Sequence, residues 1–149
     1  MPRCILPSPV GLLTVTATAN AVVSLCFGGE REMPPETALL REAACQLDAY
    51  FHGERRAFTL PLAPRGTAFQ QAVWQALCAI PCGETRSYGE IAAAIGKPRA
   101  CRAVGMANHR NPIPIFIPCH RVVGKDGALT GYVGGLAVKR TLLEMEQGR

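Results

Sequence analysis

The sequence predicts an α+β protein of two domains, a small N-terminal domain of strands with one helix and a mostly helical C-terminal domain. Three observations lead to this prediction. The first part of the chain carries β-rich runs around one amphipathic segment, and the second part carries two helix-capping motifs. Between them, residues 63–66 read Ala-Pro-Arg-Gly, which is typical of a linker. We therefore expect domains at residues 1–64 and 65–149.

The N-terminal domain is predicted to contain a β-hairpin, a helix and a further strand. Two runs rich in β-branched residues, 12–16 and 22–27, flank a turn near Asn20 and predict the hairpin. Residues 36–52 repeat apolar side chains at helical spacing. Residues 58–62 alternate apolar and polar side chains, so we expect them to form a closing strand.

The C-terminal domain is predicted to begin with three helices. Thr67–Gln70 and Ser87–Glu90 are capping boxes, in which the first and fourth side chains bond to each other's backbone N–H groups. Gly96 ends the second helix, and Pro98 suits the first turn of a third helix that runs to about Asn108. The second and third helices form a helix-turn-helix candidate. Such pairs also occur in proteins that do not bind DNA.

The third helix is predicted to have two different faces. The packing face is formed by small and apolar side chains: Ala100, Ala103, Val104 and Ala107. The opposite face is basic with one apolar member: Arg99, Arg102, Met106 and Arg110. A face of this kind suits a nucleic-acid surface.

The positive charge is concentrated in the C-terminal part. The chain has a net charge of +5, and residues 1–83 carry none of this excess. No acidic residue lies between Glu90 and Asp126, a window that contains Lys97, Arg99, Arg102, Arg110, Arg121 and Lys125. A patch of one sign suggests an anionic partner such as a nucleic-acid backbone. A solvated basic face is the alternative.

The cysteines and the hydropathy exclude several classes of protein. The seven cysteines are odd in number and include no CxxC pair, so neither a disulfide framework nor a zinc site is expected. No apolar run reaches the length of about 18 residues that a membrane helix needs, and the first residues do not resemble a secretory signal. We expect a cytoplasmic protein without a metal or cofactor.

Cys119 stands out because it follows a stiff, proline-rich segment, residues 111–118. We expect this segment to be extended, so that Cys119 and His120 point to opposite faces and cannot bond directly. A water between them, with Glu146 orienting the ring, would connect the pair. Glu146 borders an apolar stripe on the last helix, formed by Val138, Leu142 and Met145, where a carboxylate usually lies at the rim. A thiol held this way is a candidate nucleophile, although a packed core cysteine fits as well.

Several motifs, in matching order and spacing, resemble the C-terminal domain of O6-alkylguanine-DNA alkyltransferases. They are Ser-Tyr-Gly-Glu-Ile-Ala at 87–92, Arg-Ala-Val-Gly at 102–105, Asn-Pro at 111–112, Ile-Pro-Cys-His-Arg-Val at 117–122, Gly-Tyr at 131–132 and Gly-Gly-Leu at 134–136. The resemblance covers residues 69–146. The N-terminal part resembles the family's smaller, ribonuclease-H-like domain more loosely.

The resemblance implies DNA repair by a protein that reacts once. An alkyl group passes irreversibly from O6-alkylguanine, and from O4-alkylthymine, in duplex DNA to Cys119. A winged helix-turn-helix would bind the minor groove, and the damaged base would be flipped out of the stack. The family also implies a monomer that needs no cofactor.

The resemblance also assigns roles to single residues. Tyr88 would help to rotate the phosphate and give a proton to the base, Arg102 would fill the vacated place, and Asn111 would hold the turn before the active-site segment. His120 and Glu146 would form the proton relay with water. The other expected DNA contacts are Arg99, Ala103, Gly105 and Met106. The expected guanine pocket is formed by Val122, Tyr132 and Val133.

Two other classes of function remain open from the sequence. A DNA module that binds lesions without reacting would share the surface but lack the reactive thiol, whereas Cys119 is present. A thiol hydrolase would usually carry its nucleophile at a helix N-terminus facing a histidine, which the segment before Cys119 does not predict.

Overall fold

The computed structural model describes residues 1–148, which form two compact units that meet at Arg65 and Gly66. The expected boundary fell one residue earlier, between 64 and 65. In the part of the chain that is described, no helix is long and apolar enough to cross a membrane.

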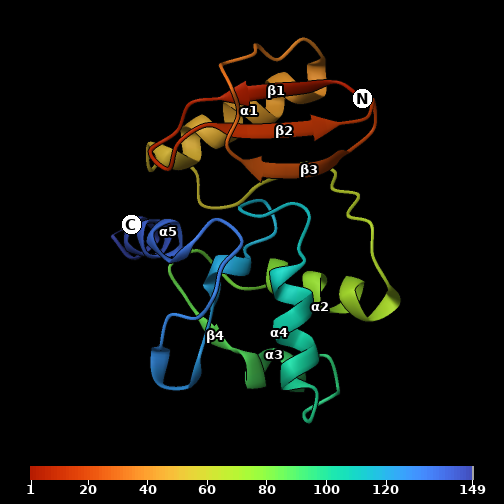
Figure 1. Cartoon of the computed structure of the whole chain (residues 1–149), viewed down its shortest axis with the longest axis vertical. Helices are drawn as coiled ribbons and strands as arrows, with labels where there is room; N and C mark the ends of the chain where they lie inside the picture. The colour runs from red at the N-terminus through yellow and green to blue at the C-terminus, as the bar shows by residue number, and fades with distance from the viewer. Residues whose placement is uncertain (149) are drawn as a thin grey trace. The chain divides into compact units, whose positions relative to one another are not determined.

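The N-terminal unit is an antiparallel three-stranded sheet with one helix (Figure 1). The strands β1 (Arg3–Leu6), β2 (Leu13–Ala17) and β3 (Val22–Phe27) lie in the order β1-β2-β3. Helix α1 (Ala38–Phe51) packs on the sheet and is capped by Thr37, whose hydroxyl accepts from the backbone N–H of Leu40 at 3.2 Å. The hairpin and helix are confirmed. Strand β1 was not predicted, because four residues between two prolines show too little alternation.

The prediction of a strand at residues 58–62 is wrong. Only one bridge forms in this segment, between Leu62 and Val22, next to the bond from the Val22 N–H to the Pro61 carbonyl at 2.9 Å. Prolines have no N–H, so Pro61 and Pro64 cannot donate to a continuing ladder. The segment therefore runs along β3 without becoming a strand.

The C-terminal unit contains short helices around a small core. Its elements are α2 (Ala68–Cys78), β4 (Arg86–Ser87), α3 (Tyr88–Ala94), α4 (Cys101–His109), η1 (Cys119–Arg121), β5 (Val122–Val123), η2 (Lys125–Gly127) and α5 (Leu136–Gln147). Both predicted capping boxes are present, at the starts of α2 and α3. Strands β4 and β5 pair in parallel, and α4 packs against α2 and α3. The Trp74 indole N–H fixes α2 to α4 by donating to the Ala107 carbonyl at 2.9 Å.

Helix α4 differs from its prediction at both its start and its packing face. It begins at Cys101, not at Pro98, because Gly96 at φ 76° ends α3 and residues 97–100 form a separate turn. Val104 and Ala107 are buried as expected. Ala103 is exposed, so it belongs to the outer surface of the helix and not to the packing face.

Candidate active site and DNA-binding surface

The segment before Cys119 is a tight loop and not the extended strand that the prolines predicted. The buried side chain of Asn111 holds it closed: Nδ2 donates to the Ile117 carbonyl, and Oδ1 accepts from the Ile113 N–H, both at 2.9 Å. Ile115 has a φ of 74°, a backbone region that β-branched residues rarely adopt. The amide therefore secures a strained turn between α4 and the cysteine.

Cys119 lies at the start of the 3₁₀ turn η1 and is only 1% exposed. The Asn108 side chain donates to its carbonyl at 3.3 Å, which fixes the backbone at this residue. Burial raises the pKa of the thiol to about 11, although a hydrogen bond from Asn111, the charge of Lys139 and a hydrogen bond from Tyr132 act in the opposite direction. The resting side chain is therefore a thiol, and it needs a base before it can react.

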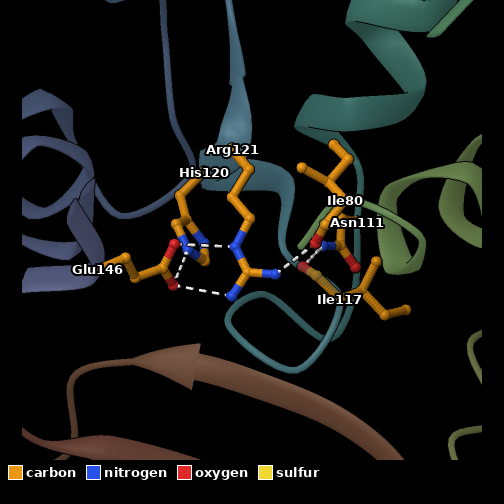
Figure 2. Close-up of polar contacts among 6 residues, drawn as sticks. All are labelled: Ile80, Asn111, Ile117, His120, Arg121 and Glu146. Atoms are coloured by element: carbon orange, nitrogen blue, oxygen red, sulfur yellow. Dashed lines mark hydrogen bonds and ion pairs between the residues drawn. The ribbon is translucent and has the colours of Figure 1, made fainter. Parts of the chain in front are cut away.

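Figure 2 shows the buried polar network beside this cysteine. His120 is fully buried, and its Nε2 lies 2.7 Å from Oε2 of Glu146. Arg121 donates two hydrogen bonds to the same carboxylate, Nε to Oε1 at 2.8 Å and Nη2 to Oε2 at 2.9 Å. Its third nitrogen, Nη1, donates to the Ile80 carbonyl at 2.7 Å. One carboxylate thus joins the histidine, the arginine and the end of α5.

Two predictions about these residues are wrong. Glu146 is 1% exposed and does not lie at the rim, because two buried donors satisfy its oxygens. Arg121 is also buried, so it does not belong to the basic surface. A charge count along the sequence cannot separate an arginine held by an internal carboxylate from one that faces solvent.

The charges of the network define which nitrogen of His120 can accept a proton. Burial would raise the pKa of Glu146, but hydrogen bonds from His120 and Arg121 bring it well below its ordinary value. Burial lowers the pKa of His120, against the opposing effect of Glu146. The ring is therefore neutral near pH 7, and Nε2 carries the hydrogen because it faces a carboxylate. Nδ1 is left as the acceptor and has no hydrogen-bond partner among the described residues.

The expected pocket residues differ in their burial. Val122 and Tyr132 are buried, and the Tyr132 ring stands edge-on to the His120 ring, with 6.4 Å between the centroids. Val133 is 46% exposed and lies at the surface of the same loop. Tyr132 and Val122 thus belong to the interior beside Cys119, whereas Val133 does not.

Tyr88 reaches this region through a residue that the sequence did not single out. Its hydroxyl is hydrogen-bonded to the side chain of Thr130, and its ring lies against Gly105 of α4. The Thr130 carbonyl in turn accepts from the ammonium of Lys139, at 3.2 Å.

Lys139 was also missed, although it is fully buried. The buried positions of α5 are Lys139, Leu142, Leu143 and Glu146, which have the spacing of one helix face. The predicted apolar stripe of Val138, Leu142 and Met145 is therefore not centred on the buried face, since Val138 and Met145 are only half-buried. Helical spacing counted back from Glu146 would have found the lysine.

The expected DNA contacts lie together on the outer face of α4 and the turn before it. Arg99, Arg102 and Ala103 are exposed, and Met106 is 58% exposed although it is apolar. A shallow hollow of about 510 Å³ is lined by Arg102, Gly105, Met106, His109 and Arg110. This surface carries positive charge and small or apolar side chains, without a carboxylate in the hollow's lining. Such a surface can take up a nucleic-acid backbone.

Two family models match almost the whole chain. The model for the 6-O-methylguanine DNA methyltransferase ribonuclease-like domain matches residues 3–64, and the model for the DNA binding domain of the same protein matches residues 68–148. A methylated-DNA–protein-cysteine methyltransferase of Methanosarcina barkeri is 53% identical over 96% of this chain and 95% of its own length.

Solved structures are similar as well. The OGT of Mycobacterium tuberculosis in complex with DNA has a TM-score of 0.88 and 49% identity, over 97% of this chain and 91% of that one. The Atl1 of S. pombe, in complex with DNA containing O6-carboxymethylguanine, has a TM-score of 0.50 and 33% identity, over 55% of this chain and 78% of that one.

Proposed function

Because this chain belongs to the 6-O-methylguanine DNA methyltransferase family, we propose that it repairs DNA by moving an alkyl group from guanine O6 to its own Cys119. O4-alkylthymine is the second proposed substrate. The observation that carries this proposal is the buried thiol of Cys119 beside a neutral His120, whose Nε2 is held by Glu146 and whose Nδ1 can accept a proton.

The proposed reaction is a displacement at carbon. The thiol proton passes to Nδ1 of His120 through a water molecule, and the Glu146 carboxylate stabilises the imidazolium that forms. The sulfur then bonds to the alkyl carbon while the bond from that carbon to O6 breaks. The electron pair stays with the guanine, which takes a proton from the Tyr88 hydroxyl. The thioether is stable in water, so each protein molecule reacts once.

The damaged base must leave the duplex to meet a sulfur that is only 1% exposed. We propose that α4 binds the minor groove through Arg99, Ala103, Gly105 and Met106, and that Arg102 occupies the place of the flipped base. Asn111 would keep the active-site loop closed in its strained form. The guanine would then lie against Val122 and Tyr132, with the backbone of Val133 at the entrance.

The remaining properties follow the same proposal. Double-stranded DNA containing the lesion is the partner, and the protein acts as a monomer without a cofactor. All seven cysteines are free, which suits the reducing conditions of the cytoplasm.

The test is mass spectrometry of the intact protein after incubation with a duplex that contains O6-methylguanine. We expect one methyl group per molecule, on Cys119, and none in Cys119→Ser. Cys101→Ser is the matched control, because Cys101 is an exposed cysteine on the proposed DNA surface and should not change the modification. Binding without a mass change would favour a lesion-binding module, and turnover of an ester would favour a hydrolase.

A further inference from the structure

Lys139 is a buried cation without a carboxylate. Its side chain is fully buried in α5, and no acidic side chain of the described residues forms a salt bridge with it. Burying an unpaired ammonium costs several kcal/mol, so its surroundings must compensate for the lost water. The Thr130 carbonyl provides one compensation, since it accepts from the ammonium at 3.2 Å. Burial lowers the pKa of Lys139, and the charge of Cys119 provides the second compensation because it raises that pKa. This second compensation is strongest when the sulfur is a thiolate.

Thr130 binds two groups of the proposed reaction at once. Its carbonyl holds the Lys139 ammonium, and its side-chain hydroxyl is bonded to the Tyr88 hydroxyl. Tyr88 comes from the start of α3 and Lys139 from the middle of α5, so Thr130 is the link between these elements. The absence of a side chain at Gly124 leaves room for the Thr130 methyl group, since a Cβ there would lie only 3.1 Å from it.

Through these two bonds Thr130 acts on the two groups that become negative in the transfer step, the sulfur and the phenol oxygen. The sulfur is negative before it attacks, and a fixed ammonium nearby favours that form. The guanine leaves as an anion and takes the phenol proton of Tyr88. A hydroxyl that donates to the phenol oxygen stabilises the negative charge that develops there. His120 then loses the former thiol proton to solvent and the phenol regains one from solvent, so the overall change is thiol plus methyl ether giving thioether plus guanine.

We propose that Thr130 is a positioning residue for alkyl transfer, which fixes the Tyr88 hydroxyl with its side chain and the Lys139 ammonium with its carbonyl. This inference rests on the proposed function, because it assigns the transfer step to Cys119 and the proton to Tyr88. Thr130 would thus act on the transfer through Tyr88 and Lys139.

The experiment compares Thr130→Val, which keeps the shape but removes the hydroxyl, with Thr130→Ser, which keeps the hydroxyl. The single-turnover rate constant of methyl transfer to Cys119 is measured with O6-methylguanine duplex and with the free base, together with the Kd for unmodified duplex and the Tm. We expect the rate constant of Thr130→Val to fall roughly 10- to 100-fold on both substrates. The Kd should change less than about twofold, and Thr130→Ser should recover most of the rate.

The matched control is Thr141→Val, which removes a hydroxyl that bonds only to the Ala137 carbonyl on the outer part of α5. Its rate constant should equal that of the unmodified chain. Three results would overturn the inference: a Thr130→Val protein that reacts as fast or faster, a Thr130→Ser protein as slow as Thr130→Val, or a rate loss matched by an equal loss of DNA affinity. If the unmodified chain itself transfers no methyl group, the proposed function fails instead.

Discussion

The carboxylate of Glu146 shows how much one residue can organise. It accepts a bond from His120 and two from Arg121, and Arg121 continues to the Ile80 carbonyl. The histidine needs the carboxylate to define its tautomer, and the carboxylate needs the arginine to remain ionised without water. The ionised form of Glu146 is thus a property of the group of three.

Replacing Arg121 by Met should therefore destabilise the protein, because it leaves the buried carboxylate without its cation. We expect the free energy of unfolding to fall by about 3–5 kcal/mol, measured by urea denaturation. Arg140→Met removes an exposed arginine from α5, the helix that carries Glu146, and should stay within about 0.5 kcal/mol of the original. If Arg121→Met with Glu146→Gln is no more stable than Arg121→Met alone, the loss does not come from the unpaired charge.

The rate of alkyl transfer should depend on pH through His120. Burial lowers the pKa of this ring from its ordinary 6.5, so it is a neutral base at pH 7 and gains a proton only in acid. The single-turnover rate constant should be level near pH 7 and fall only at a pH lower than 6.5. A rate that already falls between pH 8 and 7 would show that another group accepts the thiol proton.

The start of helix α3 shows how a helix cap can position a side chain. It has only seven residues, and its capping box secures the first turn: the Ser87 hydroxyl accepts from the Glu90 N–H at 3.1 Å, and Glu90 accepts from the Ser87 N–H at 3.0 Å. Tyr88 is the first residue after the cap. The cap therefore also places the proposed proton donor.

Ser87→Ala should cost about 1 kcal/mol of stability through the lost cap and also slow the reaction with the free base O6-methylguanine. Thr67→Ala removes the same kind of cap from α2, where no proposed reacting group follows. We expect it to lose similar stability, measured by urea denaturation, and to keep its rate constant. If Ser87→Ala and Thr67→Ala react equally fast, the α3 cap has no influence on the transfer step.

The whole molecule divides its tasks between charge outside and reactivity inside. The exposed arginines of the proposed DNA surface lie on α4 and in the turn before it, whereas the sulfur and its proposed proton relay are buried. Protein cations that contact phosphates release counterions from the DNA, and this release contributes less to binding as the salt concentration rises, so affinity for duplex should fall with ionic strength.

Arg102→Ala tests this division. Extruding a base costs a few kcal/mol, so losing the residue that we propose to fill the gap should slow repair in duplex about tenfold or more, with little effect on the free base. Single-turnover kinetics on both substrates measure the two rates. Arg140→Ala removes an equal charge from α5 and should leave both unchanged. Similar losses on the two substrates in Arg102→Ala would exclude a role in extrusion.

Local signals in the sequence were enough for most elements. Both capping boxes, the hairpin and the helices were predicted because caps, turns and apolar spacing act within a few residues. The family also followed from short motifs around Cys119. Among the wrong predictions, the strand at 58–62 and the start of α4 are two cases in which prolines and a neighbouring turn decided the backbone.

Only the tertiary structure decided which charged side chains lie inside. The sequence predicts Arg121 on a basic surface and Glu146 at a rim, and its charge pattern gives no sign that Lys139 is buried. Their burial depends on partners 25 residues or more away for Arg121 and Glu146, and on the loop carrying Thr130 for Lys139. The sequence by itself determined where the thiol, the histidine and the helix proposed to face DNA lie along the chain. The packing of α5 decided the ionisation of the histidine and of the charged side chains around it, because the energy of a charge depends on what surrounds it in space.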